Sequence, residues 1–309
     1  MAFLIICNDR DLSPWVNALK DLKPDLDVRL YPDEGNFEEI EFVLCWKHPK
    51  GILKRYPNLK VISSMGAGVD HLFTDPDLPA GVPIVRIVDP ELAQAMSEFV
   101  IGIILNQMRS LTVYHENQKQ KLWKARRFAI AKNTQIGIMG LGVLGQDLAK
   151  KLTALGFKVA GWAQSPKELK GVNVYAGCKN VETFLSETNI LVCLLPLTPQ
   201  TENILNKQTL SKLPEGAYLI NVARGEHLVD KDLIEMIDNG HLSGATLDVF
   251  RKEPLPSTHD FWNHPKIKIT PHIASLTNPA SVAPQLIENY ESAKSGRALL
   301  NKVSAKRGY

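Results

Sequence analysis

Residues 135–162 read QIGIMGLGVLGQDLAKKLTALGFKVAGW, the pattern of a strand, a glycine-rich turn, a helix and a second strand in direct succession. Gly140, Gly142 and Gly145 form the motif G-x-G-x-x-G where the first strand gives way to the helix. In such a turn the first glycine permits the tight bend, and the second lets the backbone approach a pyrophosphate. The third lets the helix press on the sheet. The stretch therefore predicts a dinucleotide-binding βαβ unit.

The residues after the second strand indicate which dinucleotide is bound. An NAD site usually places Asp or Glu there to hold the ribose 2′-hydroxyl, but the next five residues contain no carboxylate. Gln164 and Ser165 can hydrogen-bond a 2′-phosphate and Lys167 can pair with it, although a solvated Lys167 is the alternative. We expect a preference for NADP(H), with NAD(H) left open. For either cofactor, the amides of Val143 and Leu144 would face the pyrophosphate.

Short apolar runs alternate with helical patterns on both sides of this unit, as in parallel α/β proteins. A chain of 309 residues is long enough for two domains. The expected fold class is therefore α/β, with two Rossmann-like domains that each contain a doubly wound parallel sheet. The expected strands outside the glycine unit are Phe3–Cys7, Phe42–Trp46, Lys60–Ser63, Pro83–Ile87, Ile190–Leu195, Ala217–Val222, Ala245–Phe250 and Lys266–Thr270.

The cofactor domain is expected to be inserted within the other domain. Residues 1–98 and 275–309 would form the substrate-binding, catalytic domain, and residues 99–274 the cofactor domain. A helical pattern runs from Ser97 to about Trp123, which at 1.5 Å per residue would be roughly 40 Å long. Such a helix would suit both an interdomain hinge and a dimer arm. A helix over about Val282–Ser295 could return to the first domain.

Composition excludes several classes of partner. The formal net charge is only +3 and its carriers are scattered, so we expect no nucleic-acid partner; a solvated tail explains the basic segment Lys302–Arg307. No apolar run approaches the roughly 20 residues that span a membrane.

Cys7, Cys45, Cys178 and Cys193 lack metal-type spacing, so we expect no metal site. Free, mostly buried thiols and an N-terminus without a signal-peptide pattern predict a cytoplasmic location.

Three residues suited to one reaction, Arg224, Glu253 and His272, follow successive expected strands. Ligands of an open α/β sheet bind at such carboxyl ends. A guanidinium can hold the carboxylate of a small 2-oxo acid and polarise its carbonyl. Hydride arriving at C2 creates an alkoxide, and a histidine held by a carboxylate is a suitable proton donor for it. Taken one at a time, each residue also has a structural explanation. Arg224 could be a surface arginine, Glu253 a solvated turn residue, and His272 a histidine that caps a turn.

Several motifs, in order and spacing, resemble those of the D-isomer-specific 2-hydroxyacid dehydrogenases. They are MGLGVLG (139–145), LLPLTPQTENIL (194–205), LINVARGEHLVDKDLIEMIDNGHLSGATLDVFRKEPLP (219–256) and TPHIAS (270–275). SMGAGVDHLF (64–73) is similar to the family's substrate loop, and LCWKHP (44–49) favours the glyoxylate/hydroxypyruvate reductase group. The resemblance spans nearly half of the chain.

The resemblance implies a role for each matching residue. Arg224 would bind the substrate, Glu253 would pair with the histidine, and His272 would be the acid/base. Asp248 would hold the nicotinamide carboxamide. The other cofactor residues expected from these segments are Leu195, Pro196, Thr201, Val222, Ala223 and Ser275. The substrate carboxylate would meet the amides of Ala67 and Gly68, and Trp46 would line the pocket. A homodimer built on the cofactor domain is also implied.

The expected function is reduction of glyoxylate to glycolate and of hydroxypyruvate to D-glycerate, by hydride transfer to C2 with His272 as proton donor. Two alternatives stay open. One is a dehydrogenase for a larger 2-oxo acid of the phenylpyruvate or branched-chain type. The other is a non-catalytic NAD(P)H-sensing protein, which would bind the cofactor without consuming it. The physiological substrate and the direction in the cell are not specified by the sequence.

Overall fold

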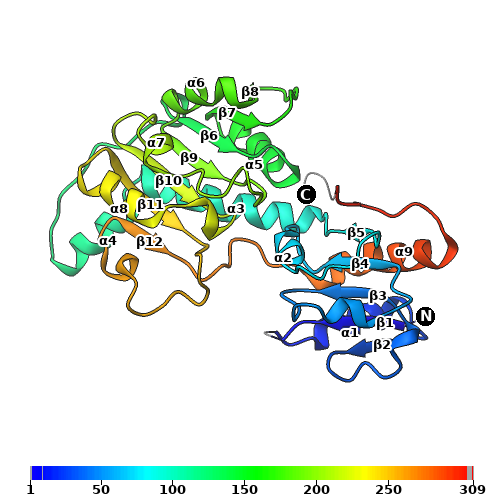
Figure 1. Cartoon of the computed structure of the whole chain (residues 1–309). Coiled ribbons are helices and arrows are strands. Elements are labelled where there is room, and N and C mark those ends of the chain that lie inside the picture. Colours follow the sequence, from blue (N-terminus) through cyan, green and yellow to red (C-terminus); the bar gives the residue numbers. More distant parts are fainter. Residues whose placement is uncertain (1, 9, 305–307, 309) are drawn as a thin grey trace. The chain divides into compact units, whose positions relative to one another are not determined.

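The chain forms two parallel β-sheets, one in each of two compact units. The computed structural model describes residues 2–8, 10–304 and 308, so residues 305–307 of the basic segment lie outside the described residues. One unit comprises Met1–Leu92 and Thr277–Tyr309, and the other Ala93–Leu276. The second unit therefore interrupts the first along the chain (Figure 1).

The sheet of the second unit has the strand order β12-β11-β10-β9-β6-β7-β8, and every pair is parallel. The chain starts at β6, moves outward to β8, and then returns to β9 and moves outward to β12. This reversal is the switch point at which doubly wound sheets bind ligands. The strands are β6 (Gln135–Met139), β7 (Lys158–Ala163), β8 (Val172–Ala176), β9 (Ile190–Cys193), β10 (Ala217–Asn221), β11 (Leu242–Leu247) and β12 (Ile267–Ile269).

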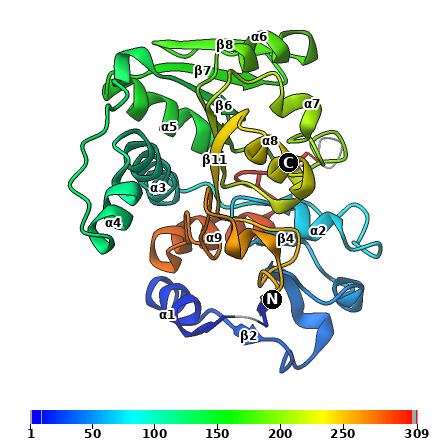
Figure 2. The same cartoon turned by 90° about the vertical axis from the view of Figure 1, so that its left-hand side faces the viewer.

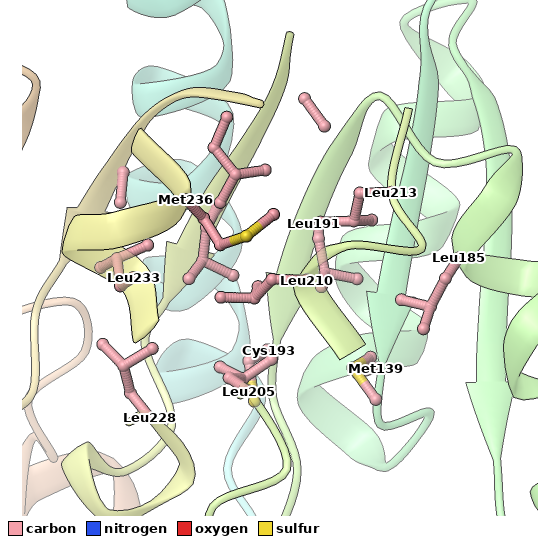
Figure 3. Packing of buried hydrophobic residues seen from close by; sticks show 14 of the residues in the cluster. Met139, Leu185, Leu191, Cys193, Leu205, Leu210, Leu213, Leu228, Leu233 and Met236 are labelled. Atoms are coloured by element: carbon pink, nitrogen blue, oxygen red, sulfur yellow. The ribbon is translucent and has the colours of Figure 1, made fainter. Parts of the chain in front are cut away.

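Helices cover both faces of this sheet because its strands send apolar side chains to both sides. Ile136 and Ile138 of β6 pack in a cluster with residues of α3 and α5. Met139 packs in the opposite cluster with residues of α6, α7 and α8 (Figure 3). Each such side chain, once fully buried, contributes about 1.5–3 kcal/mol. The helices are α3 (Pro90–Met108), α4 (Leu111–Lys119), α5 (Val143–Ala154), α6 (Val181–Ser186), α7 (Lys207–Leu210) and α8 (Asp230–Asp238).

The sheet of the first unit has the parallel order β2-β1-β3-β4-β5. Helix α9, from the end of the chain, packs in one apolar cluster with α1 and the N-terminal strands (Figures 1 and 2). The elements are β1 (Ala2–Ile6), α1 (Ser13–Leu22), β2 (Val28–Leu30), β3 (Ile40–Cys45), β4 (Val61–Ser64), α2 (Asp70–Phe73), β5 (Ile84–Val85) and α9 (Pro279–Ser295). The expected fold class, two parallel α/β sheets, is confirmed.

One expectation about the elements is wrong. The pattern over residues 97–123 predicted a single helix, but the chain forms α3 and α4 and leaves the helical region after Lys119. The break occurs at Ser110, whose φ of +54° is left-handed and cannot continue a right-handed helix. Helix α3 also begins earlier than expected, at Pro90, a residue that is well tolerated in a first helical turn. Among the described residues, no helix is long and apolar enough to cross a membrane.

Candidate active site

The glycine turn between β6 and α5 has the geometry of a phosphate cradle. Gly140 has a φ of +106°, and a Cβ there would lie 2.6 Å from the Leu194 carbonyl oxygen. A Cβ on Gly145 would lie 2.0 Å from the carbonyl oxygen of Gly140, so α5 approaches the turn as only glycine allows. Gly142 differs, because a Cβ there would have no neighbour within 4 Å. Space for a ligand therefore lies beside Gly142, at the N-terminus of α5.

The residues after β7 lie close to this turn. Lys167 Nζ donates a 2.7 Å hydrogen bond to the Leu141 carbonyl oxygen, which also accepts from Gln146 Nε2 at 2.9 Å. Lys167 is half-buried, and Gln164 and Ser165 are exposed. A lysine ammonium is thus fixed beside the turn, which argues against the alternative of a fully solvated side chain.

The segment that follows β9 forms a tight loop, which hydrogen bonds within the segment hold together. Thr201 Oγ1 donates to the Pro196 carbonyl oxygen at 2.7 Å and accepts from the Thr198 amide at 2.9 Å. His227 Nε2 lies 3.3 Å from the same Pro196 oxygen, and its Nδ1 lies 3.2 Å from the Arg224 carbonyl oxygen. Leu195 is buried. His227, which is fully buried and was not singled out from the sequence, therefore joins this loop to the arginine loop.

Arg224 stands just beyond β10, preceded by the buried Val222 and Ala223. Asn221 holds the turn: its Nδ2 donates to the Arg224 carbonyl oxygen at 2.9 Å, and its Oδ1 accepts from the Ala223 amide at 3.2 Å. A Cβ on Gly225 would lie 2.0 Å from the Phe250 carbonyl carbon, so this turn packs directly on the loop that follows β11. The arginine is positioned by backbone packing that only glycine at 225 permits.

His272 and Glu253 form a direct pair. His272 Nδ1 lies 2.9 Å from Glu253 Oε2, and the side chains are 33% and 22% exposed. Glu253 Oε1 in turn accepts from the Phe250 amide at 3.1 Å. The backbone therefore orients the Glu253 carboxylate, and this carboxylate in turn orients the His272 imidazole. When Nδ1 is the nitrogen bound to the carboxylate, Nε2 is the one available for proton transfer.

Asp248 lies immediately after β11 and its side chain is fully buried. Its Oδ1 accepts from Thr270 Oγ1 at 2.6 Å and from the Ile273 amide at 3.0 Å. Its Oδ2 accepts from the Ala274 amide at 2.8 Å. In the sequence, one of these donors precedes His272 and the other two follow it. Ser275, the next residue, is half-buried.

In the first unit, Trp46 follows β3 and packs against the loop after β4. A Cβ on Gly66 would lie 3.2 Å from the Trp46 ring, and the His71 ring centroid is 4.6 Å from that of Trp46. Ser64 Oγ donates to the Gly68 carbonyl oxygen at 2.7 Å and lies 3.0 Å from His71 Nε2. The loop that carries Ala67 and Gly68 is therefore fixed from within its own unit. His71 was not identified from the sequence.

The sequence-predicted residues form two groups. Arg224, Glu253 and His272 follow β10, β11 and β12, which are neighbours in one sheet, and parallel strands end at the same edge. The glycine turn follows β6 at this edge too. Trp46, Ala67 and Gly68 follow β3 and β4, neighbours in the other sheet. Thr270, the first residue of the TPH motif, was missed as a support of the site, because a threonine there carries no chemical signal of its own.

At the edge of the second unit's sheet, the glycine turn is suited to a dinucleotide, the guanidinium to a carboxylate, and the histidine–carboxylate pair to proton transfer. Reduction of a carbonyl next to a carboxylate needs groups of these kinds.

The chain is similar to known proteins over nearly its whole length. Residues 101–274 match the family model described as D-isomer specific 2-hydroxyacid dehydrogenase, NAD binding domain. A curated relative, the glyoxylate/hydroxypyruvate reductase A of Yersinia enterocolitica, is 39% identical over 96% of both chains.

Two solved structures are also similar. A D-isomer specific 2-hydroxyacid dehydrogenase from Xanthobacter autotrophicus, in complex with NADPH and MES, has a TM-score of 0.95 and 39% identity. The match covers 100% of this chain and 99% of that one. An NADPH-dependent glyoxylate/hydroxypyruvate reductase from Sinorhizobium meliloti, in complex with NADP and sulfate, has a TM-score of 0.94 and 36% identity over the full length of both chains.

Proposed function

Because the chain belongs to the D-isomer specific 2-hydroxyacid dehydrogenase family, as its motifs predicted, we propose that it is an NADPH-dependent reductase of small 2-oxo acids. Glyoxylate, giving glycolate, and hydroxypyruvate, giving D-glycerate, are the proposed substrates. The names of the similar proteins from Yersinia enterocolitica and Sinorhizobium meliloti support this choice.

The residues present fit a bound NADPH, which supplies the hydride to C2 of the substrate. The open space at Gly142 and the first amides of α5, from Val143 and Leu144, suit its pyrophosphate. Lys167, with Gln164 and Ser165, is proposed to bind the 2′-phosphate. The other proposed cofactor contacts are Gly140, Gly145, Leu195, Pro196, Thr201, Val222, Ala223 and Ser275.

The substrate is proposed to be held by its carboxylate. The backbone of Arg224 is fixed beyond β10 by Asn221 and by packing of Gly225, and its Nη1 donates to the Ala223 carbonyl oxygen at 2.7 Å. A guanidinium can form two parallel hydrogen bonds to a carboxylate and raise the electrophilicity of the adjacent carbonyl. The amides of Ala67 and Gly68, and Trp46, are proposed as the contribution of the first unit to substrate binding.

The observation that carries this proposal is the 2.9 Å pair of His272 Nδ1 and Glu253 Oε2. The Glu253 carboxylate holds the Nδ1 side of the ring, so Nε2 is the nitrogen left for proton transfer. His272 Nε2 can then give its proton to the oxygen on C2 as negative charge develops there.

The test is the loss of absorbance at 340 nm with purified protein. NADPH and NADH are compared, each with glyoxylate, hydroxypyruvate, pyruvate and phenylpyruvate. We expect the largest kcat/KM with NADPH and either of the two proposed acids. Preferred turnover of phenylpyruvate would contradict the substrate class, and cofactor binding without turnover of any acid would contradict the reaction.

The active form is proposed to be a homodimer. Leu111 of α4 and, after this helix, Leu122, Trp123 and Phe128 are exposed. Exposed apolar side chains that gather in one segment of the chain are typical of a protein–protein contact. Helix α4 is anchored to its own sheet, because Lys268 Nζ of β12 donates to Thr112 Oγ1 at 2.7 Å. We propose that a second copy of the chain covers this surface.

The proposed location is the cytoplasm. All four cysteines are free, and three of them are buried. Burial raises the pKa of Cys193 to about 12, and burial likewise raises the pKa of Cys45. Both thiols therefore stay protonated and unreactive at neutral pH, as in proteins of a reducing compartment.

A further inference from the structure

The catalytic histidine is held in a backbone conformation that a histidine rarely adopts. His272 has a φ of +55°, in the left-handed region. Its own amide donates to the Thr270 carbonyl oxygen at 3.1 Å, which closes a narrow turn. A non-glycine residue keeps such a conformation only where its surroundings impose it. The Glu253 carboxylate contacts the imidazole ring and does not explain the backbone conformation.

Groups on both sides of His272 in the chain converge on Asp248. The Asp248 carboxylate accepts from a residue before His272, Thr270, and from the two residues after it, Ile273 and Ala274. The three distances are 2.6, 3.0 and 2.8 Å, so both oxygens are used. The side chain is fully buried, and hydrogen bonds to a buried carboxylate are strong.

We propose that Asp248 is a positioning residue that fixes the His272 turn and thereby aims the imidazole at the substrate. The proposal rests on the proposed function, because it assumes that His272 is the proton donor. It differs from the role that the family resemblance implies for Asp248, which is a contact to the nicotinamide carboxamide. Asp248 acts on the backbone of the turn, whereas Glu253 acts on the ring.

The two roles predict different kinetic results for Asp248→Asn. The asparagine keeps one oxygen acceptor and replaces the other with an NH₂ group, which cannot accept from an amide. If Asp248 positions His272, kcat falls by about a hundredfold, as is expected for a displaced catalytic group. The KM for the oxo acid and the dissociation constant of NADPH, followed by its fluorescence, stay within about threefold. If Asp248 acts through the carboxamide, the NADPH dissociation constant rises by about tenfold or more, and the proposal is wrong.

Thr270 provides a second test that leaves Asp248 in place. Thr270→Val keeps the shape of the side chain and removes the donor, so we expect kcat to fall by about tenfold with unchanged NADPH affinity. Thr270→Ser keeps the hydroxyl and should retain near-normal kcat. Equal losses in the two variants would show that side-chain packing matters rather than the bond to Asp248, and would overturn the proposal.

The decisive measurement combines Asp248→Asn, or Thr270→Val if the former does not fold, with His272→Ala. A residue that acts only through His272 has no further effect once the imidazole is gone, so residual turnover should equal that of His272→Ala alone. Additive losses would overturn the positioning role and leave the proposed function intact. A wild-type enzyme without turnover of any 2-oxo acid would instead reject the proposed function and, with it, this inference.

Discussion

At the scale of single residues, each proposed catalytic side chain is held by a partner that has no reacting role. Glu253 is oriented by the Phe250 amide before it binds His272, and Asn221 shapes the turn of Arg224. Such support matters because a catalytic group must be held within a fraction of an ångström to be effective. The predictions for single residues therefore distinguish a variant that loses a reacting group from a variant that loses substrate or cofactor binding.

Removal of the imidazole tests the proton donor. We expect His272→Ala to lower kcat by about 10²- to 10⁴-fold, the usual contribution of a general acid, while NADPH still binds with near-normal affinity. His115→Ala, which removes an exposed histidine of α4, is the matched control and should leave kcat unchanged. The measurement is steady-state oxidation of NADPH with hydroxypyruvate. Near-normal turnover of His272→Ala would remove His272 from the role of proton donor.

Removal of the guanidinium tests the substrate contact. Arg224→Ala should raise the KM for the oxo acid and lower kcat, together by about a hundredfold or more in kcat/KM. The dissociation constant of NADPH should hardly change, since the guanidinium is assigned to the substrate. Arg297→Ala removes an arginine that pairs with Glu288 in the first unit and serves as the control. A collapse of NADPH binding in Arg224→Ala would show that the arginine serves the cofactor instead.

The cofactor preference is tested at Lys167. Its ammonium lies beside the glycine turn, bound to the Leu141 carbonyl oxygen, and we assign it to the 2′-phosphate. Lys167→Ala should raise the KM for NADPH by about tenfold, or about 1.4 kcal/mol, and leave the KM for NADH unchanged. The exposed neighbour Lys170 provides the control substitution, Lys170→Ala. Equal effects on both cofactors would mean that Lys167 supports the turn rather than the phosphate.

At the scale of elements, the order β6–turn–α5–β7 sets the position of the site. The strand, turn and helix were predictable because their signals are local, namely the glycine spacing and the apolar patterns on both sides of it. The strands β2 and β8 were not singled out, because three to five half-exposed residues leave little apolar pattern. The break at Ser110 was missed for a related reason, since a left-handed serine has no compositional signature.

The site itself was predictable only in part. Arg224, Glu253 and His272 could be named because their chemistry and their places after strands are visible in the chain. The supports of these residues, such as Thr270 and His227, could not be, because hydrogen bonds between separate loops depend on the folded backbone.

The glycine turn gives a prediction that separates fold from cofactor binding. In Gly142→Ala the new methyl group meets no protein atom within 4 Å, so the melting temperature should stay unchanged while NADPH affinity falls by about tenfold or more. In Gly145→Ala the methyl group would collide with the Gly140 carbonyl oxygen, and stability should fall by about 1–3 kcal/mol. Thermal unfolding and NADPH fluorescence measure the two effects. Normal NADPH affinity in Gly142→Ala would exclude the pyrophosphate from this turn.

At the scale of the whole molecule, the proposed site residues are distributed over two units, each with its own parallel sheet. The proposed cofactor residues and the three proposed catalytic side chains belong to the unit Ala93–Leu276, and Trp46, Ala67 and Gly68 belong to the other. The same unit that carries the catalytic residues also carries the exposed apolar surface after α4.

This surface predicts the assembly state. Sedimentation velocity should give twice the mass of one chain, and Trp123→Ala should weaken the dimer by about 30-fold, a typical loss for a tryptophan at the centre of an interface. Trp262 is also exposed and its Nε1 donates to the Pro256 carbonyl oxygen, so Trp262→Ala is the control and should remain dimeric. A wild-type protein that sediments as a single chain at micromolar concentration would contradict the proposed assembly.

The central claim, reduction at C2 by this chain, is tested most directly by following the hydrogen itself. The protein would be incubated with hydroxypyruvate and NADPH deuterated at both C4 positions of the nicotinamide, and the product analysed by NMR and for its configuration. We predict D-glycerate with one deuterium at C2 for each NADPH oxidised, and no such product with His272→Ala on the same timescale. Glycerate without deuterium at C2, product of L configuration, or bound NADPH that is never oxidised would contradict the account.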